Sequence, residues 1–580
     1  MLQCKNSQCG VALARDIAIC LPSSWDGGFG RRKNDRGITM ANVAATADAL
    51  GGQRLVDKAE ERRVIFASSL GTVFEWYDFY LYAILAPFFA ALFFPPGNAT
   101  AALLSAFATY AAGFLIRPFG ALVFGRVGDM VGRKYTFLIT ITTMGLSTFL
   151  VGLMPTYSSV GIWSTVLLVT LRLVQGLALG GEYGGAATYV AEHAPQNRRG
   201  YATSWIQTTA TLGLFLALVI IYFCREFIDP KVFLDWGWRI PFLVSIILLA
   251  FSVYIRLKLN ESPVFQRMVE EDRRSTKPLT ESFFHYPNNK YVLLALLGAT
   301  AGQGVVWYTG QFYALFFLTI TLKVNYISAY ILIGLSLVIG TPFFIFFGWL
   351  SDRIGRLKII LAGCLIAAVT YFPLFQGLTH YANPALEKFQ QTHKITVAAD
   401  PATCNFHILI LPSTTFSDCD KAQDLLTKSG LSFDTLPGVA GQTVVTKINE
   451  VTLNGFDAAK YGAALKAAGY PATADPAQLN WFMVELLLVI MVIYVTMVYG
   501  PIAAFLVELF PAKIRYTSMS LPYHIGNGWF GGMLPLLATA MVAASGDIYR
   551  GLWYPIIVAV MSLVIGALLL RDNRGIDIHT

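Results

Sequence analysis

The chain has 580 residues, of which 55% are hydrophobic and only 13% are charged, and its formal net charge is +8. This composition is unusually apolar for a water-soluble protein of such length, so it indicates that a lipid bilayer surrounds most of the chain. The excess positive charge lies mainly in loops on one side of the predicted spans, which suits contact with anionic lipid and implies no nucleic acid.

The first segment, residues 1–63, is predicted to be a polar cytoplasmic tail. Arg15 and Asp16 interrupt the apolar core that a signal peptide would need, so residues 1–39 are interpreted as disordered. Met40 begins a more typical tail, and an artefact of start-site choice is a second interpretation of the residues before it. Three cysteines at irregular spacing are weak evidence for a metal, and no metal site is predicted.

Runs of roughly 20 apolar residues follow, and each can cross a bilayer as a helix that satisfies its own backbone. Residues 64–257 are predicted to form a six-helix bundle, with spans near residues 65–93, 101–124, 135–155, 162–190, 201–223 and 240–257. A cytoplasmic linker is predicted at residues 258–290. A second six-helix bundle is predicted from residues 291–378 and 481–570, with spans near residues 291–318, 328–349, 359–378, 481–505, 518–543 and 552–570. The predicted fold class is therefore an all-α polytopic membrane protein of twelve transmembrane helices in two repeats, ending in a cytoplasmic tail at residues 571–580.

Two polar loops between these spans carry the same motif, GRVGDMVGRK from Gly125 to Lys134 and GWLSDRIGRLK from Gly348 to Lys358. Four residues recur at a constant offset of 223 residues: Gly125, Asp129, Gly132 and Arg133 correspond to Gly348, Asp352, Gly355 and Arg356. Parallel repeats of a helix bundle are typical of carriers that rock two halves about a central substrate site. The duplication therefore predicts a transporter that works by alternating access.

A second pair of signatures, EHAPQNRR at Glu192 and ELFPAKIR at Glu508, repeats at a larger offset of 316 residues. The difference of 93 residues requires an insertion in the second half, and the apolar pattern stops over residues 379–480. Within that insertion, strand-like runs alternate with helix-like runs and predict a small α+β domain. The strand-like runs are residues 395–398, 406–411 and 443–453, and the helix-like runs are residues 420–428 and 457–468.

The loops on the side of the duplicated motif hold roughly seventeen Lys and Arg residues, against about four in the short loops opposite. This asymmetry predicts that both termini lie in the cytoplasm. The insertion then lies outside the cytoplasm, over the outer mouth of the bundle. An oxidising compartment would allow Cys404 and Cys419 to pair there, and two free thiols are the alternative.

Acidic residues inside the spans are the main candidates for proton coupling, because a charge in a bilayer costs about 2.5–3.5 kcal/mol. Glu75 and Asp78 are three residues apart in the first span, so both carboxylates share a helix face with Tyr82. Two such acids can hold a proton between them. The alternative is that one acid pairs with an arginine and only fixes helix packing.

The fourth span carries Arg172, Gln175 and Glu182 along one helical stripe. Arg172 is always charged and can exchange ionic partners, whereas Glu182 can gain or lose a proton, so both are predicted to serve coupling. A purely structural salt bridge is the alternative. Arg117 closes the second span, and its guanidinium is predicted either to bind a substrate carboxylate or to reach the lipid headgroups.

The second half has few charges inside its spans, so coupling is assigned to the first half. Gln303, Trp307 and Gln311 follow helical spacing in the seventh span and are candidate substrate contacts, together with Gln175 and Arg117 in the first half. Plain packing is the alternative for the residues of the seventh span.

The duplicated loops are the candidate gate. Asp129 can meet a helix N-terminus or an arginine of the other half, while Arg133 and Lys134 can hold acidic partners. The same roles are predicted for the matching residues of the second copy, with glycines at the turns. The predicted gating set is Gly125, Asp129, Gly132, Arg133, Lys134, Asp352, Gly355 and Arg356.

Four segments resemble the metabolite:proton symporter family of the major facilitator superfamily: EWYDFYLY at residues 75–82, GFLIRPFGALVFGRVGDMVGRK at 113–134, LGGEYGG at 179–185 and GWRIPF at 237–242. The resemblance covers all twelve spans. It implies proton-coupled import of a small polar metabolite, usually a carboxylate, across a bacterial inner membrane, with Asp129 and Arg133 latching the inward gate. The insertion at residues 379–480 departs from the well-known members, which are permeases for α-ketoglutarate, citrate, shikimate, proline or betaine.

Three functions compete: a proton-coupled symporter, an uncoupled facilitator and a nontransporting receptor that uses the outer domain. The acids inside the spans favour the first, and the lack of a large cytoplasmic signalling domain disfavours the third. No zinc spacing, phosphate loop or nucleophile elbow stands out, so neither an enzyme nor a cofactor is predicted. The expected partners are a small-molecule substrate, protons and the lipid bilayer, and the chain is expected to act as a monomer.

Overall fold

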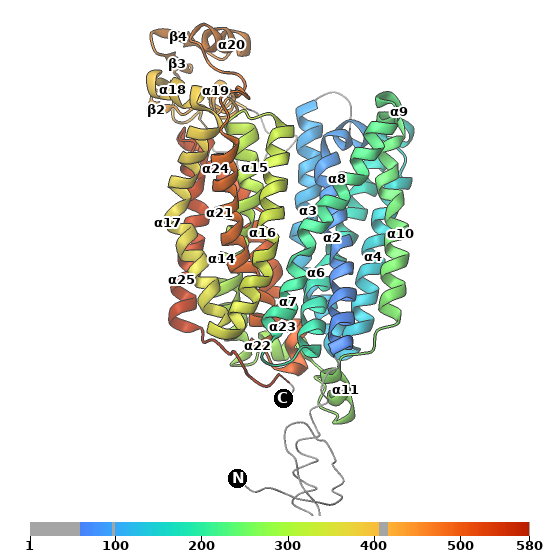
Figure 1. Cartoon of the computed structure of the whole chain (residues 1–580). Coiled ribbons are helices and arrows are strands. Elements are labelled where there is room, and N and C mark those ends of the chain that lie inside the picture. Colours follow the sequence, from blue (N-terminus) through green and yellow to red (C-terminus); the bar gives the residue numbers. More distant parts are fainter. Residues whose placement is uncertain (1–57, 95–98, 405–415, 579–580) are drawn as a thin grey trace, which may run out of the picture. The chain divides into compact units, whose positions relative to one another are not determined.

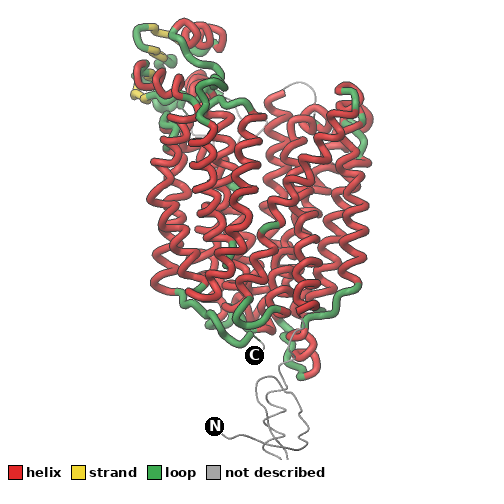
Figure 2. Tube along the Cα trace, in the orientation of Figure 1, coloured by secondary structure: helices red, strands yellow, loops and turns green. Residues whose placement is uncertain are grey.

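The computed structural model describes residues 58–94, 99–404 and 416–578, and residues 56–580 form one compact unit. Residues 1–57 of the tail predicted at residues 1–63 lie outside the described residues, and residues 58–63 belong to the first helix. Helices dominate this unit, and the strands are confined to the insertion (Figure 2).

The first half consists of long helices that run between the two ends of a bundle (Figure 1). They are α2 (Lys58–Phe93), α3 (Ala99–Met130), α4 (Arg133–Leu153), α6 (Ile162–His193), α7 (Arg199–Gln207) continued by α8 (Thr209–Phe227), and α10 (Ile240–Leu257). The connections contain α5 (Tyr157–Val160), α9 (Pro230–Asp235) and η1 (Gly237–Arg239). Two short helices, α11 (Pro263–Glu270) and α12 (Pro278–Phe283), lie between this half and the next.

The second half begins with one long helical segment, residues 288–321, in which the hydrogen-bond pattern changes repeatedly from α to π. It comprises α13 (Asn288–Ala295), η2 (Leu296–Thr300), α14 (Ala301–Tyr308), η3 (Thr309–Tyr313), α15 (Ala314–Phe316) and η4 (Phe317–Thr321). Then follow α16 (Tyr326–Ile354), α17 (Arg356–Ala382), α21 (Trp481–Tyr499), α22 (Ile502–Leu509), η5 (Ala512–Ile514), α23 (Arg515–His524), η6 (Ile525–Gly531), α24 (Leu534–Ser545), η7 (Arg550–Leu552) and α25 (Trp553–Leu569). The wide π turns within residues 288–321 are of a kind that often occurs at functional sites in helices.

Ten helical segments in the described part of the chain are long and apolar enough to cross a membrane. The helices α2 and α3, with 36 and 32 residues, are not among these ten. The fold is therefore a polytopic helical bundle, and the count of twelve spans stays a prediction.

Glycines make the sharp turns in both copies of the duplicated motif. Gly132 separates α3 from α4 with a φ of 137°, and Gly355 separates α16 from α17 with a φ of 114°. Residues with a side chain rarely adopt these angles. Each glycine therefore lets the chain reverse direction at one end of the bundle, which keeps the neighbouring Asp and Arg at the helix ends.

The insertion folds as a four-stranded sheet with three helices. Its elements are α18 (Pro384–Thr392), β1 (Ile395–Ala399), α19 (Asp418–Lys428), β2 (Asp434–Pro437), β3 (Val445–Ile448), β4 (Val451–Asn454) and α20 (Ala458–Ala467). The strand order is β2-β1-β3-β4, with β1 parallel to β2 and antiparallel to β3. The run at residues 443–453, expected as one strand, is a hairpin that turns at Asn449, where φ is 51°. The expected strand at residues 406–411 lies outside the described residues.

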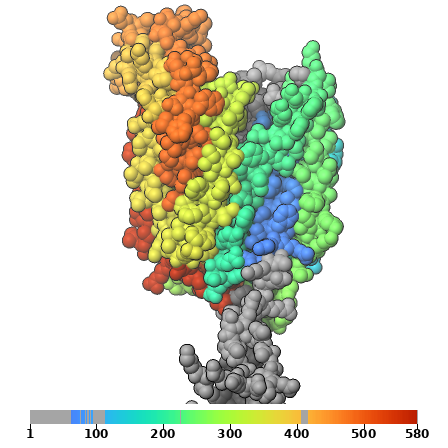
Figure 3. Space-filling view, viewed as in Figure 1, coloured from blue at the N-terminus to red at the C-terminus, as the bar shows by residue number. Residues whose placement is uncertain are grey.

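Backbone contacts tie the insertion to the second half. The N–H of Phe433 donates to the carbonyl of Gly546 at 2.8 Å, at the end of α24. The N–H of Ala474 donates to the carbonyl of Lys323 at 2.9 Å, just after η4. The space-filling view shows the insertion above the yellow-to-red half of the molecule (Figure 3). These contacts attach the insertion to loops from two different hairpins of the second half.

Cys404 and Cys419 are joined by a disulfide, with their Cα atoms 5.2 Å apart. It closes a loop with a sequence separation of 15 residues, for which the chain-entropy model gives about 3 kcal/mol of stabilisation. The cysteines Cys224 and Cys364 are buried and free.

We predict that, in protein denatured without reductant, maleimide modifies Cys224 and Cys364 but leaves Cys404 and Cys419 unmodified. Peptide mass spectrometry measures the modification at each position, and the two free thiols serve as internal controls. Modification of both insertion cysteines without reductant would show that this disulfide is absent from the native protein.

Candidate functional site

The first copy of the duplicated motif forms a buried charge cluster, here called latch A, made of Asp129, Arg133, Glu192 and Arg515. Arg133 lies 3.3 Å from Asp129 and 3.6 Å from Glu192. Arg515, which belongs to the second half, lies 2.9 Å from the other oxygen of Glu192. All four side chains are almost fully buried. Latch A is therefore an ionic contact between the two halves of the bundle.

Asp129 also caps a helix of the opposite half. Its carboxylate accepts backbone hydrogen bonds from Tyr516 at 3.3 Å and Thr517 at 2.8 Å, in the first turn of α23. A helix N-terminus has unpaired N–H groups and a partial positive charge, so a carboxylate there is stabilised. Gly125 permits this contact, because a Cβ atom at that position would lie 2.9 Å from the Cα of Thr517.

The second copy forms the mirror arrangement, here called latch B, made of Asp352, Arg356, Glu508 and Arg199. Arg356 lies 2.5 Å from Asp352 and 3.0 Å from Glu508. Arg199, from the first half, lies 3.7 Å from Glu508. The offset of 223 residues relates Asp352 and Arg356 to the aspartate and arginine of the first motif, and the offset of 316 residues relates the other two members to those of latch A. The duplicated motifs therefore hold the halves together twice, at the same end of the bundle.

Asp352 caps a helix of the first half. Its two oxygens accept the N–H groups of Gly200 at 2.9 Å and Tyr201 at 2.8 Å, in the first turn of α7. Each half thus supplies one aspartate that holds the N-terminus of a helix in the other half. This finding agrees with the expectation that Asp129 meets a helix N-terminus across the interface between the halves.

A further carboxylate supports each motif turn. Glu261 accepts the N–H of Lys134 at 3.1 Å, and Asp572 accepts the N–H of Leu357 at 3.1 Å. Burial raises the pKa of the Glu261 carboxyl. The ammonium group of Lys134 donates to the carbonyl of Leu257 at 3.2 Å. Lys134 thus meets an acidic partner through its backbone, and its side chain helps to hold the end of α10.

The C-terminal segment crosses both latches. Arg199 of latch B donates to the carbonyl of Ile576 at 2.8 Å, and Arg515 of latch A donates to the carbonyl of Ile578 at 2.9 Å. The side chain of Ile578 is buried. Because arginine presents several donors in a fixed fork, each latch arginine can hold a carboxylate and this segment together. The last described residues of the chain therefore complete the closed end of the bundle.

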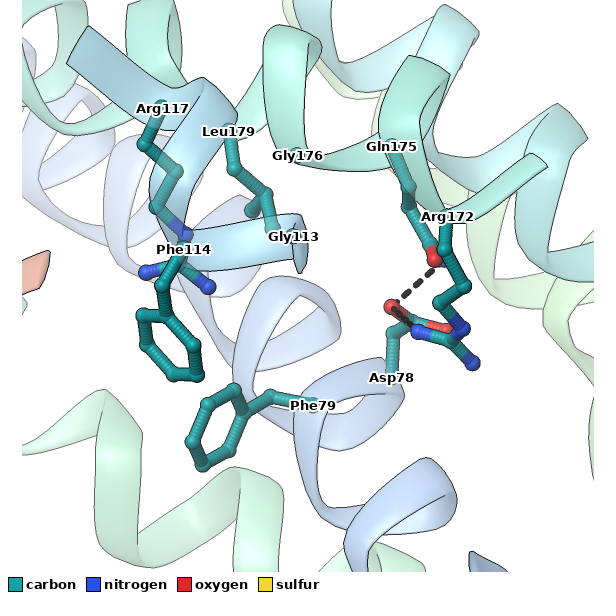
Figure 4. A pocket seen from close by; sticks show the side chains of 9 residues that line it. All are labelled: Asp78, Phe79, Gly113, Phe114, Arg117, Arg172, Gln175, Gly176 and Leu179. Carbon is teal, nitrogen blue, oxygen red and sulfur yellow. Dashed lines mark hydrogen bonds and ion pairs between the residues drawn. The ribbon is translucent and has the colours of Figure 1, made fainter. Parts of the chain in front are cut away.

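A second group of buried polar side chains lies at mid-bundle, around Asp78 on α2 (Figure 4). The side-chain amide of Gln175 donates to Asp78 at 2.6 Å, and Arg172 lies 3.6 Å from the same carboxylate oxygen. The Arg172 guanidinium also covers the ring of Tyr82, at 3.8 Å from its centroid. The structure thus brings three predicted site residues, Asp78, Arg172 and Gln175, into direct contact.

Several polar atoms of this group have no hydrogen-bond partner among the described residues. They are Oδ1 of Asp78, Nε and Nη2 of Arg172, and Oε1 of Gln175. A buried polar atom without a partner costs free energy, so such atoms in a native site call for a physical explanation. All three residues line a cavity, where a bound group or a proton would complete these atoms.

The cavity is lined by residues of α2, α3 and α6. Its walls are Asp78, Phe79, Gly113, Phe114, Arg117, Arg172, Gln175, Gly176 and Leu179. The Arg117 guanidinium lies over the ring of Phe114, 4.4 Å from its centroid. Figure 4 shows Arg117 and Arg172 approaching from different helices, so two cations and one carboxylate line this cavity. Of the two roles expected for Arg117, this position favours ligand binding over a reach to the headgroups.

Glu182 forms a separate buried pair with Arg256 of α10. Their closest atoms are 3.4 Å apart, and both side chains are at most 1% exposed. The Arg256 guanidinium lies 3.7 Å from the ring centroid of Phe137. The expected stripe of Arg172, Gln175 and Glu182 therefore divides between two sites. Arg172 and Gln175 contact Asp78 on α2, whereas Glu182 contacts Arg256 on α10.

The side chain of Glu75 lies outside the described residues, so its expected sharing of a proton with Asp78 stays a prediction. Sequence reasoning missed Arg256, which lies inside the predicted sixth span at residues 240–257 but was not considered as a partner for Glu182. An arginine within the last apolar turn of a span was the signal that could have identified it, because a charge at that depth needs a partner.

The three candidates of the seventh span are buried and have different surroundings. Gln303 exchanges two side-chain hydrogen bonds with Asn527, at 3.0 and 2.8 Å. Trp307 packs against Trp76 of the first half, with ring centroids 5.2 Å apart. Gln311 is 5% exposed and lies in η3. Of the three, Trp307 thus contacts the first half, and none of them lines the cavity around Asp78.

Aromatic rings fill the interface beside these residues. Phe312 lies 5.8 Å from Phe79, centroid to centroid, and Tyr523 stacks on Tyr183 at 3.6 Å. Aromatic pairs gain energy beyond simple burial, so they stabilise contact between the halves at mid-bundle. Among the described residues, no group of three or more His, Cys, Asp or Glu could hold a metal ion.

Comparison with known proteins gives the same class as the fold. Residues 64–290 match the family described as sugar (and other) transporter. The proline/betaine transporter of Escherichia coli K12 is 34% identical over 60% of this chain and 68% of its own length. The shikimate transporter of the same strain is 35% identical over 55% of this chain and 72% of its own length. The alpha-ketoglutarate permease of that strain is 32% identical over 60% of this chain and 78% of its own length.

Among solved structures, the proton:xylose symporter XylE from E. coli, bound to 6-bromo-6-deoxy-D-glucose, has a TM-score of 0.62 at 15% identity, covering 90% of this chain and 98% of that chain. The fold is thus that of a major facilitator transporter, a multi-pass membrane protein that carries small molecules. The chain belongs to the metabolite:proton symporter family of that superfamily. Its relatives are transporters and not enzymes.

We predict that Glu192→Gln destabilises the protein by several kcal/mol, because it leaves Arg133 and Arg515 buried with a neutral partner. Breaking a buried ion pair in this way costs about 3–5 kcal/mol. Thermal unfolding in detergent measures the effect as a lower midpoint.

The matched control is Glu271→Gln. Glu271 lies 3.1 Å from Arg273, but both side chains are more than half exposed, so its loss costs only about 0–1 kcal/mol. Equal unfolding midpoints for the two variants would contradict the ionic role of latch A.

Proposed function

We propose that this protein is a secondary active transporter that imports a small polar metabolite, a carboxylate or zwitterion, together with protons by alternating access. The observation that carries the proposal is the buried Asp78–Arg172 pair, which borders a cavity and retains unpartnered polar atoms. An ionisable residue inside a membrane is costly and is usually retained for function.

The pair suggests a simple exchange of partners. When Asp78 is charged, it holds Arg172 and accepts the amide of Gln175. When Asp78 takes up a proton, its attraction for Arg172 falls, and the guanidinium becomes available to an anionic group in the cavity. Arg117 adds a second cation on another wall. A carboxylate and a proton would thus be bound together and released together.

Glu182 is a second candidate for proton binding. It is fully buried, only one of its oxygens contacts Arg256, and the other has no hydrogen-bond partner among the described residues. A proton on that free oxygen would remove the charge of Glu182 and so weaken its attraction for Arg256. Gln303, Trp307 and Gln311 are proposed to contact the substrate from the second half when the aromatic interface separates.

The latches are proposed to close the cytoplasmic end. Loop charge favours a cytoplasmic position for the latch end and both termini, and the insertion lies at the opposite end of the bundle (Figure 1). With α2 and α3 as two further spans, the bundle has twelve, and the insertion is periplasmic. Rocking of the halves would then break both latches to open the site inward.

Proton coupling limits the ratio to which the substrate can be accumulated. One proton moving down 100 mV supplies about 2.3 kcal/mol, which supports roughly fifty-fold accumulation of a neutral substrate. An uncoupled facilitator is the second candidate function, and it is favoured only if the buried acids do not change their protonation during the cycle. A receptor role for the insertion has no comparable support.

We predict that proteoliposomes accumulate one member of a radiolabelled panel of organic acids and betaines when an inward proton gradient is applied. Asp78→Asn and Glu182→Gln should abolish accumulation but allow downhill exchange, because each removes a proton-binding group and not the cavity. The exposed Glu271→Gln serves as the control. Uphill accumulation by both amide variants at the wild-type level would exclude proton coupling at these acids.

We predict that Asp129→Asn lowers the maximal uptake rate while changing the substrate KM much less, because latch A lies away from the cavity. The neutral amide weakens the cap on α23 and the pair with Arg133. Uptake kinetics measure both constants, and Asp424→Asn, which removes an exposed pair with Lys428 in the insertion, is the control. An unchanged rate would count against a gating role for the latch.

A further inference from the structure

Tyr516 breaks the symmetry between the two latches. It follows Arg515 at the start of α23, and the residue at the same position of the first repeat is Gly200, at the start of α7. Both residues donate a backbone N–H to a latch aspartate. Only Tyr516 also has a side chain that can reach into the opposite half.

The Tyr516 ring occupies a slot lined by glycines of the first half. A Cβ atom on Gly128 would lie 2.0 Å from the ring, one on Gly184 would lie 3.0 Å from it, and one on Gly185 would lie 2.5 Å from the hydroxyl. These distances are at or below the shortest that real Cβ atoms show, so a side chain at any of the three positions would force the ring or its hydroxyl to shift. Tyr516 itself is fully buried. The ring is therefore gripped by α3 and α6 and has no free space around it.

The hydroxyl of Tyr516 ends next to the proposed proton site. It donates a hydrogen bond to the carbonyl of Gly181, the residue directly before Glu182 on α6. The backbone N–H of the same tyrosine donates to Asp129 of latch A at 3.3 Å. One residue of the second half thus contacts both the backbone at Glu182 and the latch.

The symmetry is broken at the acid as well. The residue that corresponds to Glu182 in the second repeat, at the offset of 316 residues, is Val498. At latch B the position of Tyr516 is therefore held by a glycine, and the position of Glu182 is held by a valine. The two asymmetric features occur together on latch A, although they lie far apart in the sequence.

We propose that Tyr516 is a positioning residue that couples the charge state of Glu182 to the closure of latch A. The charged groups around it are Glu182 on α6, Arg256 on α10, and Asp129 and Arg133 at the junction of α3 and α4. Loss of charge on Glu182 relaxes its attraction for Arg256 and lets α6 shift. Because packed interfaces have few intermediate arrangements, the gripped ring must move with α6 and withdraw its N–H from Asp129.

This inference rests on the proposed function, because it requires Glu182 to exchange a proton. The experiment uses spin labels at Tyr135→Cys and Lys358→Cys, two exposed and repeat-related positions just beyond the latch glycines, one in each half. Pulsed electron paramagnetic resonance then measures the distance between the halves at the latch end. The three cysteines within residues 1–39, Cys4, Cys9 and Cys20, are replaced by serine.

In the otherwise unchanged chain, the ratio of separated to closed halves should rise as the pH falls from roughly 8 to 5, where a buried carboxyl takes up its proton. Glu182→Gln should remove this response. Tyr516→Phe keeps the ring and loses only the hydroxyl, and it should reduce the pH-driven change in that ratio by about tenfold, the equivalent of one buried hydrogen bond.

Tyr77→Phe is the matched control. Tyr77 is equally buried and its hydroxyl also donates to a backbone carbonyl, that of Pro241, but both residues belong to the first half. This variant should keep the full pH response. Gly185→Ala tests the same contact from the side of α6, because its methyl group displaces the hydroxyl, and it should reproduce the loss seen in Tyr516→Phe.

The outcomes separate the two proposals. A distance that does not respond to pH in the unsubstituted chain overturns proton exchange at Glu182 and the coupling built on it. A response that Glu182→Gln abolishes but that Tyr516→Phe and Gly185→Ala retain in full overturns the role of Tyr516 alone. A loss in Tyr77→Phe as large as that in Tyr516→Phe also overturns it, because any buried hydroxyl would then have the same effect.

Discussion

The closed end of this transporter depends on two aspartates that each hold the first turn of a helix in the opposite half. A helix N-terminus carries unpaired N–H groups, and these donate hydrogen bonds to Asp129 and Asp352. They replace the hydrogen bonds to water that each carboxylate loses on burial. The arginines and glutamates around them balance the remaining charge. Because all these groups are away from water, separation of the halves must rehydrate them, which makes closure a discrete state and not a continuum.

The two halves share this frame but differ in their chemistry. The first half contains the buried pairs Asp78–Arg172 and Glu182–Arg256, whereas the second half contains the Gln303–Asn527 amide pair and presents aromatic rings to the interface. The insertion adds to this difference, since its backbone bonds tie loops of the second half together. The buried acid–arginine pairs described here thus belong to the first half, and the insertion braces the second.

Sequence reasoning was accurate where the chain repeats itself. The constant offsets predicted that Asp129 and Asp352 have the same role, and both cap a helix across the interface. The second offset exceeds the first by 93 residues, and this excess indicated the insertion that lies between α17 and α21. The same reasoning missed Arg256 and placed Glu182 on one stripe with Arg172, because helical spacing reports which residues share a face and not which neighbouring helix each of them meets.

The amino-acid sequence by itself determined that the chain is a duplicated membrane bundle with acids in its first half, because apolar length, repeat offset and charge placement are properties of the linear order. Only the tertiary structure decided the partners of those acids, the slot that holds Tyr516 and the path of the C-terminal segment over both latches. The physical reason is that a buried charge or ring is satisfied by atoms hundreds of residues away, and these are brought near only by helix packing.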